Sequence, residues 1–242
     1  MTLDRRMTLV EHLEEVRRRL LICLAAVFIA SCAAFWKVRQ IVSYLSRPVG
    51  SLVFLSPTEA FMAYLKVAFF AGLFISSPVL LCQIWGFISP ALERKEKRTA
   101  LFLFPAAAIL FLGGAAFAFF LVIPFALKFL INFSGPEVIA VFSISAYLSF
   151  VIMLVIMFGV VFELPVVVII LAKLGLITPS FLSRNRKYAV LVIFITAAVL
   201  TPTPDAFTQT LMAVPMIFLY EISIWMAKLV VRPGSPLENK II

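Results

Sequence analysis

The sequence predicts an all-α integral membrane protein with six transmembrane helices and both termini on the cytoplasmic side. Three observations predict this fold class: the composition, the spacing of long apolar segments and the distribution of basic residues. Hydrophobic residues make up 63% of the 242 residues and charged residues 14%, whereas soluble domains average about 45–50% and about 25%. A soluble domain of this length cannot bury so much apolar surface, so most of that surface must face lipid.

The same composition excludes several classes of protein. Intrinsic disorder requires low hydrophobicity and high charge, which is the opposite of this chain. Three cysteines and a single histidine stand apart in the sequence, so we expect no disulfide framework, no metal site and no cofactor. They are Cys23, Cys32, Cys82 and His12. No nucleophile elbow, Walker loop, HExxH or dinucleotide-binding fingerprint occurs, so we expect no catalytic residues and no enzymatic activity.

The first expected element is a short amphipathic helix before the first span. Thr8-x-x-Glu11 has the form of a helix-capping box. The apolar residues around it share one helical face: Leu9, Leu13, Val16 and Leu20. We expect this helix to lie at the membrane interface and to run into the first span. No small-residue cleavage site follows a short apolar stretch, so we expect no removed signal peptide, with Met1 or Met7 as the start.

The expected spans are apolar segments long enough to cross a hydrocarbon core of about 30 Å, for which a helix needs about 20 residues. They cover residues 20–36, 61–88, 101–129, 147–174, 188–200 and 209–231, within a single polytopic membrane domain over residues 1–242. The second to fourth are longer than the bilayer requires, so we expect them to tilt or to project into water. The fifth is too short for a full span, which implies local thinning of the bilayer or shielding by neighbouring helices.

The orientation follows from the basic residues. Sixteen of the 21 lie in segments on one side of the six expected spans: Arg5, Arg6, Arg17, Arg18, Arg19, Arg94, Lys95, Lys97, Arg98, Lys173, Arg184, Arg186, Lys187, Lys228, Arg232 and Lys240. Four lie on the other side, namely Lys37, Arg39, Arg47 and Lys128, and Lys66 lies within a span. The positive-inside rule therefore places both termini in the cytoplasm. The net charge of +9 is accordingly a signal of orientation, and we expect no binding of nucleic acid.

Three charged residues lie within expected spans. Glu163 lies inside the fourth, Lys66 in the second and Glu221 near the centre of the sixth. A charge at the bilayer centre costs at least about 2.5–3.5 kcal/mol, so Glu163 should face a cavity or a partner. The residues alone leave open a polar functional site or a packing residue. A proton- or ion-coupled secondary transporter using Glu163, Glu221 and Lys66 is the alternative function, although no inverted repeat or pair of broken helices supports it.

Two other acids lie among bases on segments that border the membrane. Glu15 has Arg19 four residues later, so an ion pair along the helix is one interpretation. Glu96 lies between lysines and arginines, where a solvated surface charge is the ordinary interpretation. The residues alone also leave Glu14 and Glu93 as rivals on the same two segments. A separate feature, Gly113-Gly114 in the third span, is typical of close helix packing.

Five segments together resemble the TatC family, the multispanning core subunit of the twin-arginine protein translocase. They are HLEEVRRRLL at 12–21, QIWGFISPALERKEKR at 83–98, YLSF at 147–150, FGVVFELPV at 158–166 and LTPTPDAFTQTL at 200–211. They occur in the order found in the family and extend over essentially the whole chain. The resemblance implies six spans with cytoplasmic termini, in the inner membrane of a prokaryote.

The resemblance also implies a receptor for signal peptides that carry two consecutive arginines on proteins exported already folded. The residues that match the family's signal-peptide site are Glu15, Glu96, Phe87, Pro90 and Leu92. Glu163 matches a polar residue inside the membrane concavity. The family's partner subunits dock along the fifth and sixth spans, at positions matched here by Thr201, Asp205 and Gln209. The implied partners are single-span TatA- and TatB-type subunits and further copies of the chain.

Overall fold

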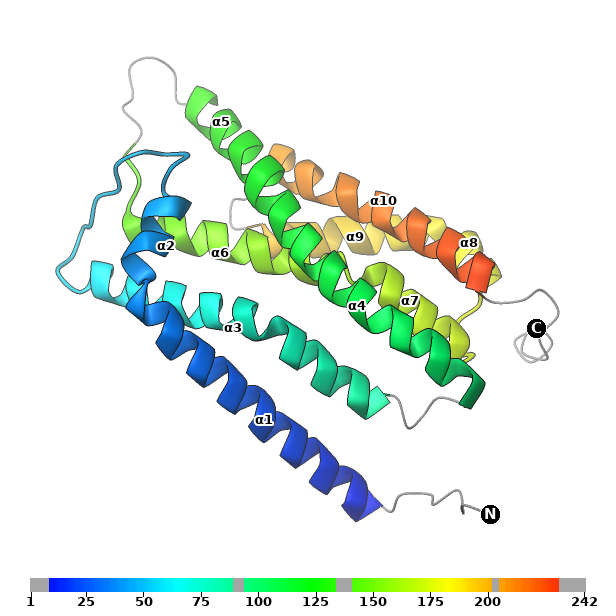
Figure 1. The fold of residues 1–242 in the computed structure, drawn as a ribbon. Coiled ribbons are helices and arrows are strands. Elements are labelled where there is room, and N and C mark those ends of the chain that lie inside the picture. The colour runs from blue at the N-terminus through cyan, green and yellow to red at the C-terminus, as the bar shows by residue number, and fades with distance from the viewer. Residues whose placement is uncertain (1–8, 89–93, 134–140, 202–204, 231–242) are drawn as a thin grey trace. The chain divides into compact units, whose positions relative to one another are not determined.

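The computed structural model describes residues 9–88, 94–133, 141–201 and 205–230, which form helices joined by short connections (Figure 1). Within these ranges the only β feature is an isolated bridge between Val53 and Ser143. The chain divides into two compact units. The first comprises Met1–Arg47 and Phe54–Phe104, and the second Pro48–Val53 and Pro105–Ile242.

The first unit contains two long helices side by side, α1 and α3 (Figure 1). Its elements are α1 (Leu9–Trp36), α2 (Val38–Leu45), α3 (Glu59–Ile88) and the start of α4 (Arg94–Phe117). The predicted interfacial helix and the first predicted span form one continuous helix, α1. Where α1 packs against α3, a Cβ on Gly72 would lie 2.5 Å from the backbone nitrogen of Ser31 and 2.6 Å from its Cα. Glycine therefore allows the two backbones to approach closely.

The second unit holds the remaining helices. They are the rest of α4, a π-helical turn η2 (Ala118–Val122), α5 (Ile123–Phe133), α6 (Ile144–Val161), α7 (Leu164–Lys173), α8 (Pro179–Arg184), α9 (Arg186–Leu200) and α10 (Ala206–Val230). The helices α4, η2 and α5 follow one another without a loop. Ser143 begins α6, since its side-chain oxygen accepts a hydrogen bond from the backbone nitrogen of Ala146. A serine in extended conformation at this position satisfies a donor that the first helical turn leaves free.

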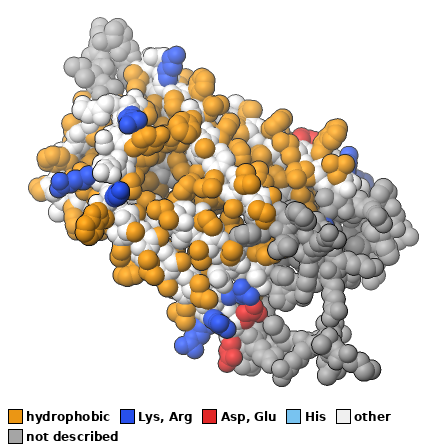
Figure 2. Space-filling view, in the orientation of Figure 1, with side chains coloured by type: hydrophobic (Ala, Val, Ile, Leu, Met, Phe, Trp, Pro, Cys, Tyr) orange, Lys and Arg blue, Asp and Glu red, His pale blue; other side chains and the backbone are white. Residues whose placement is uncertain are grey.

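Among the described residues, five helical segments are long and apolar enough to cross a membrane: Leu13–Trp36, Glu59–Phe87, Pro105–Asn132, Ile144–Lys173 and Ala206–Leu229. They correspond to the predicted first to fourth and sixth spans. The predicted fifth span coincides with α9, which has 15 residues. At 1.5 Å per residue this helix is about 22 Å long, shorter than the hydrocarbon core of about 30 Å. Figure 2 shows hydrophobic side chains over most of the described surface on the face in view, as a lipid-facing surface requires.

The fourth predicted span is two helices in the structure, because α6 ends at Val161 and α7 begins at Leu164. Pro165 occupies the first turn of α7, where the missing N–H costs no helical hydrogen bond. The same proline cannot donate to the carbonyl four residues earlier, so it favours a new helix over continuation of α6. Glu163 lies at this interruption, as the residue that precedes α7.

Aromatic side chains pack beside the interruption. The ring of Phe117 lies 5.6 Å from that of Phe158 and 5.5 Å from that of Phe162, measured between centroids. A Cβ on Gly114 would clash with the backbone oxygen of Phe158 and would lie 2.7 Å from Cγ of Phe162. A Cβ on Gly113 would meet nothing within 4 Å. Of the two adjacent glycines, only Gly114 is needed for close packing in this unit.

Candidate functional site

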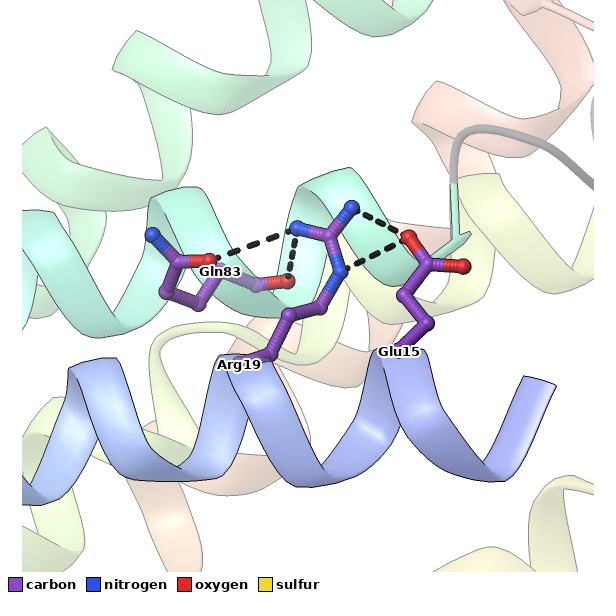
Figure 3. Close-up of polar contacts among 3 residues, drawn as sticks. All are labelled: Glu15, Arg19 and Gln83. Atoms are coloured by element: carbon purple, nitrogen blue, oxygen red, sulfur yellow. Dashed lines mark hydrogen bonds and ion pairs between the residues drawn. The ribbon is translucent and has the colours of Figure 1, made fainter. Parts of the chain in front are cut away.

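The candidate site lies on the N-terminal part of α1, where Glu15 and Arg19 face α3 (Figure 3). The two residues are four positions apart, so their side chains meet on one face of the helix. Nε of Arg19 donates a hydrogen bond of 2.9 Å to Oε1 of Glu15, and Nη2 donates to the same oxygen. The ion pair that the spacing allowed is therefore formed.

The other edge of the Arg19 guanidinium contacts α3. Its Nη1 donates to the backbone oxygen and to the side-chain Oε1 of Gln83, each at 3.3 Å (Figure 3). Gly86, one turn further along α3, provides the space. A Cβ at that position would lie 2.9 Å from Cζ and 3.0 Å from Nη2 of Arg19. One guanidinium thus joins a carboxylate on α1 to two neutral acceptors on α3.

The two carboxylate oxygens of Glu15 differ in their hydrogen bonding. The Glu15 side chain is 19% exposed and that of Arg19 is 26% exposed. Oε2 of Glu15 is buried and has no hydrogen-bond partner among the described residues. An ionised carboxylate has about four acceptor positions, and Arg19 uses only those of Oε1. The carboxylate therefore has capacity for a further cationic donor once Oε2 becomes accessible.

The structure describes little of the second predicted acid. The backbone of Glu96 belongs to α4, but its side chain lies outside the described residues, as do Pro90 and Leu92. Phe87 lies half-buried at the end of α3. The described residues therefore bring Glu15 together with Arg19 and Gln83, while the pairing of Glu15 with Glu96 stays a prediction. No sequence pattern indicated a role for Gln83 or Gly86, although both lie within the QIWGF segment.

Glu221, one of the charged residues within the spans, forms an ion pair with Arg186. Its Oε1 lies 2.7 Å from Nε of Arg186, and its Oε2 accepts from Nη2 at 2.9 Å. This is a bidentate pair between α10 and the first residue of α9. No local sequence pattern indicates this pair, because the two residues are 35 positions apart. Lys66 lies half-buried on α3.

Glu163 is half-buried and directly follows Phe162, whose ring packs against that of Phe117. Its Oε1 is buried and has no hydrogen-bond partner among the described residues. A buried polar atom without a partner is costly, so it marks a place that another group can satisfy. This geometry is compatible with the polar site that the sequence predicted, and the polar role stays a prediction. Within the described ranges, no group of three or more His, Cys, Asp or Glu side chains could hold a metal ion.

The three predicted docking residues lie where α9 ends and α10 begins: Thr201 follows α9, Asp205 precedes α10 and Gln209 is in the first turns of α10. Thr201 ends α9, and its hydroxyl donates to the backbone oxygen of Ala198 at 3.2 Å. Asp205 precedes α10, and its Oδ1 accepts from the backbone nitrogen of Thr208 at 2.6 Å. The amide of Gln209 donates to the backbone oxygen of Phe194 on α9 at 3.0 Å. Each of these residues therefore forms a hydrogen bond within the α9–α10 hairpin, in addition to any contact with a partner subunit.

The Asp205 side chain should stabilise the start of α10, because it caps the helix. Asp205→Ala removes the oxygen that accepts from Thr208, so we expect a loss of about 0.5–2 kcal/mol in the free energy of unfolding. Asp205→Asn keeps a cap oxygen and should stay within about 0.5 kcal/mol of the wild type. Thermal unfolding of the purified protein in detergent measures both. If the two variants lose equal stability, the cap oxygen is not what stabilises the start of α10.

The sequence is similar to known proteins over nearly its whole length. The family model described as Sec-independent protein translocase protein (TatC) matches residues 11–215. A Sec-independent protein translocase protein TatC of Carboxydothermus hydrogenoformans is 46% identical over 231 residues, which cover 94% of this chain and 95% of that protein. Its counterpart in Aquifex aeolicus is 42% identical over 241 residues, covering 96% and 100% respectively.

The fold of this chain is also similar to that of a solved structure. The crystal structure of a twin arginine translocase receptor, TatC, matches with a TM-score of 0.82 and 42% identity, and the match covers 92% of this chain and 100% of that chain. These matches confirm the resemblance found in the five sequence segments and the all-α membrane fold. The chain belongs to the TatC family, the multi-pass membrane proteins of a Sec-independent protein translocase in bacteria.

Proposed function

We propose that this chain binds the twin-arginine signal peptides of folded cargo proteins and forms the core of the translocase that exports them. One observation carries the proposal: the chain is 42% identical to a solved protein described as a twin arginine translocase receptor, with a TM-score of 0.82. The two relatives named above are described as Sec-independent translocase proteins, and each aligns with more than nine-tenths of this chain. The activity requires recognition and movement of a peptide, and no bond is made or broken.

The proposed recognition uses the chemistry of carboxylates with guanidinium groups. An arginine side chain pairs with a carboxylate through two parallel N–H donors, so two adjacent arginines need two separate acids. Glu15 supplies one, on a segment where Arg17 and Arg18 are exposed. Glu96 is proposed as the other, with Phe87, Pro90 and Leu92 around it. The surrounding bases would repel a cationic peptide that lacks an exact match to the two acids.

The proposed setting is the cytoplasmic membrane of a bacterium, with both termini in the cytoplasm. The uneven distribution of basic residues supports this orientation, because it places Glu15 and Glu96 on the side where cargo is made. We propose that the apolar part of the signal then inserts along the helices near Glu163. Single-span TatA- and TatB-type subunits would dock at the α9–α10 hairpin beside Thr201, Asp205 and Gln209, and further copies of the chain would complete the complex.

Binding of a labelled signal peptide to the purified protein in lipid nanodiscs tests the receptor function. We expect the twin-arginine peptide to bind at least about tenfold more tightly than the same peptide with two lysines, because a lysine offers one point charge and no planar fork. A peptide with the two arginines moved into its cargo-side segment, at constant net charge, is the control. Equal affinity for all three peptides would rule out the proposed recognition.

A further inference from the structure

The carboxylate of Glu15, which the proposed function assigns to a peptide arginine, already holds a guanidinium. Arg19 donates to Oε1 through Nε and Nη2 (Figure 3). The occupant therefore has the same chemistry as the proposed ligand. A peptide arginine that spans both carboxylate oxygens needs Oε1, which Arg19 already holds with two donors.

We propose that Arg19 is a built-in competitor for Glu15, which keeps the carboxylate paired in the resting protein and leaves it when a signal-peptide arginine binds. This inference rests on the proposed function, because it describes the regulation of the same site. Arg19 would then lower the apparent affinity for every ligand that needs Glu15. Ligands that do not use this carboxylate would be unaffected.

The burial of the second carboxylate oxygen favours displacement of Arg19 over binding beside it. Oε2 of Glu15 is buried and unpartnered among the described residues, so an arriving fork cannot reach both oxygens in the present arrangement. The Arg19 side chain is the more exposed partner, at 26% against 19%. It is also a long, flexible side chain, which can move without any shift of the α1 backbone.

The geometry of the pair also makes the exchange favourable for an arginine. Both donors of Arg19 point at Oε1, so the resting pair leaves half of the carboxylate unused. A peptide arginine that spans both oxygens would make the parallel two-point pair, which is the stronger arrangement. The exchange replaces one charge pair by another, so no charge is left uncompensated on Glu15.

The displaced guanidinium retains partners on α3. Nη1 of Arg19 already donates to the backbone oxygen and to Oε1 of Gln83, each at 3.3 Å. Gly86 leaves the space beside them, since a Cβ there would lie 2.9 Å from Cζ of Arg19. When Arg19 releases Glu15, it still has hydrogen-bond acceptors on α3. These acceptors lower the free-energy cost of the exchange.

Removing the competitor tests the proposal. Binding of a labelled twin-arginine signal peptide is measured at physiological salt for the wild type, Arg19→Met and Arg18→Met. Arg18→Met is the matched control, because it removes the same charge from an exposed neighbouring position on α1. We expect Arg19→Met to bind the peptide about twofold to fivefold more tightly, the range that a partly exposed ion pair provides. Arg18→Met removes only the general repulsion from an exposed base, so it should change the affinity by less than about twofold, since charges that make no contact are largely screened.

A charge-conserving variant separates loss of the fork from loss of the charge. Arg19→Lys keeps the positive charge but cannot contact Glu15 and Gln83 at once through a planar group. We expect its affinity for the peptide to lie between those of the wild type and Arg19→Met. Unchanged or weaker binding by Arg19→Met, an equal gain in Arg18→Met, or wild-type affinity in Arg19→Lys would each overturn the proposal.

The variant Glu15→Gln distinguishes this proposal from the proposed function. If the carboxylate is the receptor for a peptide arginine, Glu15→Gln alone weakens binding, and adding Arg19→Met to it produces no further change. Loss of binding in Glu15→Gln together with no gain in Arg19→Met would overturn the competitor role and leave the receptor function intact. Wild-type binding by Glu15→Gln would overturn the receptor role itself.

Discussion

Glu15→Gln is expected to weaken binding of a twin-arginine signal peptide by about 10- to 100-fold, which corresponds to the loss of a hydrogen-bonded charge pair. Glutamine keeps the length and one oxygen of the side chain but removes the negative charge and one acceptor. The dissociation constant of a labelled peptide, measured in nanodiscs, gives the size of the effect. Glu15 pairs with Arg19 at partial exposure, so the variant should lose no more than about 1 kcal/mol of folding stability.

Glu14→Gln is the matched control for this prediction. Glu14 is exposed on the same helix and adjacent in sequence, so its replacement removes the same charge from nearly the same place. We expect a change of less than about twofold in peptide affinity, as for other exposed charges that make no direct contact. If both variants weaken binding equally, the peptide responds to the general potential of the segment and makes no specific pair with Glu15.

Gly114→Ala is expected to destabilise the protein by about 1–3 kcal/mol, the usual cost of forcing an extra methyl group into a packed core. The new Cβ would clash with the backbone oxygen of Phe158 and would lie 2.7 Å from Cγ of Phe162. A backbone oxygen cannot rotate away as the end of a long side chain can, so the helices must shift. Thermal unfolding in detergent should show a lower midpoint for this variant.

The neighbouring glycine supplies the control. A Cβ on Gly113 meets nothing within 4 Å, and Gly113 is exposed. Gly113→Ala should therefore be neutral, or stabilising by up to about 1 kcal/mol, because alanine loses less backbone entropy in a helix. Similar destabilisation by the two variants would show that the packing beside Phe158 is not the cause.

The spans could be predicted from the sequence because lipid imposes a simple requirement. A segment that crosses the bilayer must be apolar over a fixed length and must satisfy its own backbone hydrogen bonds, so it must be a helix. The short fifth span was also expected, and α9 has 15 residues. The interruption between α6 and α7 was not expected. The pattern of hydrophobic residues continues through it, and only Pro165 gives a local signal that a new helix begins.

The sequence predicts only the local contacts of the candidate site. The four-residue spacing of Glu15 and Arg19 is a local pattern, so the sequence could suggest their pair. The contact of Arg19 with Gln83 joins residues 64 positions apart. It depends on how α1 packs against α3, which no local pattern encodes. The pair of Arg186 with Glu221, 35 positions apart, was missed for the same reason.

At the α9–α10 hairpin, the sequence predicts the external role of three residues but not their internal contacts. The family resemblance implied that Thr201, Asp205 and Gln209 contact partner subunits. The structure adds that Asp205 caps α10 and that Gln209 bonds to the backbone of α9. A variant at either position can therefore reduce assembly by loosening the hairpin. Asp205→Asn, which keeps the cap oxygen, is the variant that removes the charge with the least effect on the fold.

A double-mutant cycle between Glu15 and the arginines of the signal peptide tests the central claim most directly. Peptides with each arginine replaced singly by lysine are bound to the wild type and to Glu15→Gln, and the four dissociation constants of each cycle are compared. We predict that lysine at one of the two positions weakens binding at least about tenfold in the wild type and less than about twofold in Glu15→Gln. Equal losses in both proteins, for both positions, would show that no peptide arginine pairs with Glu15.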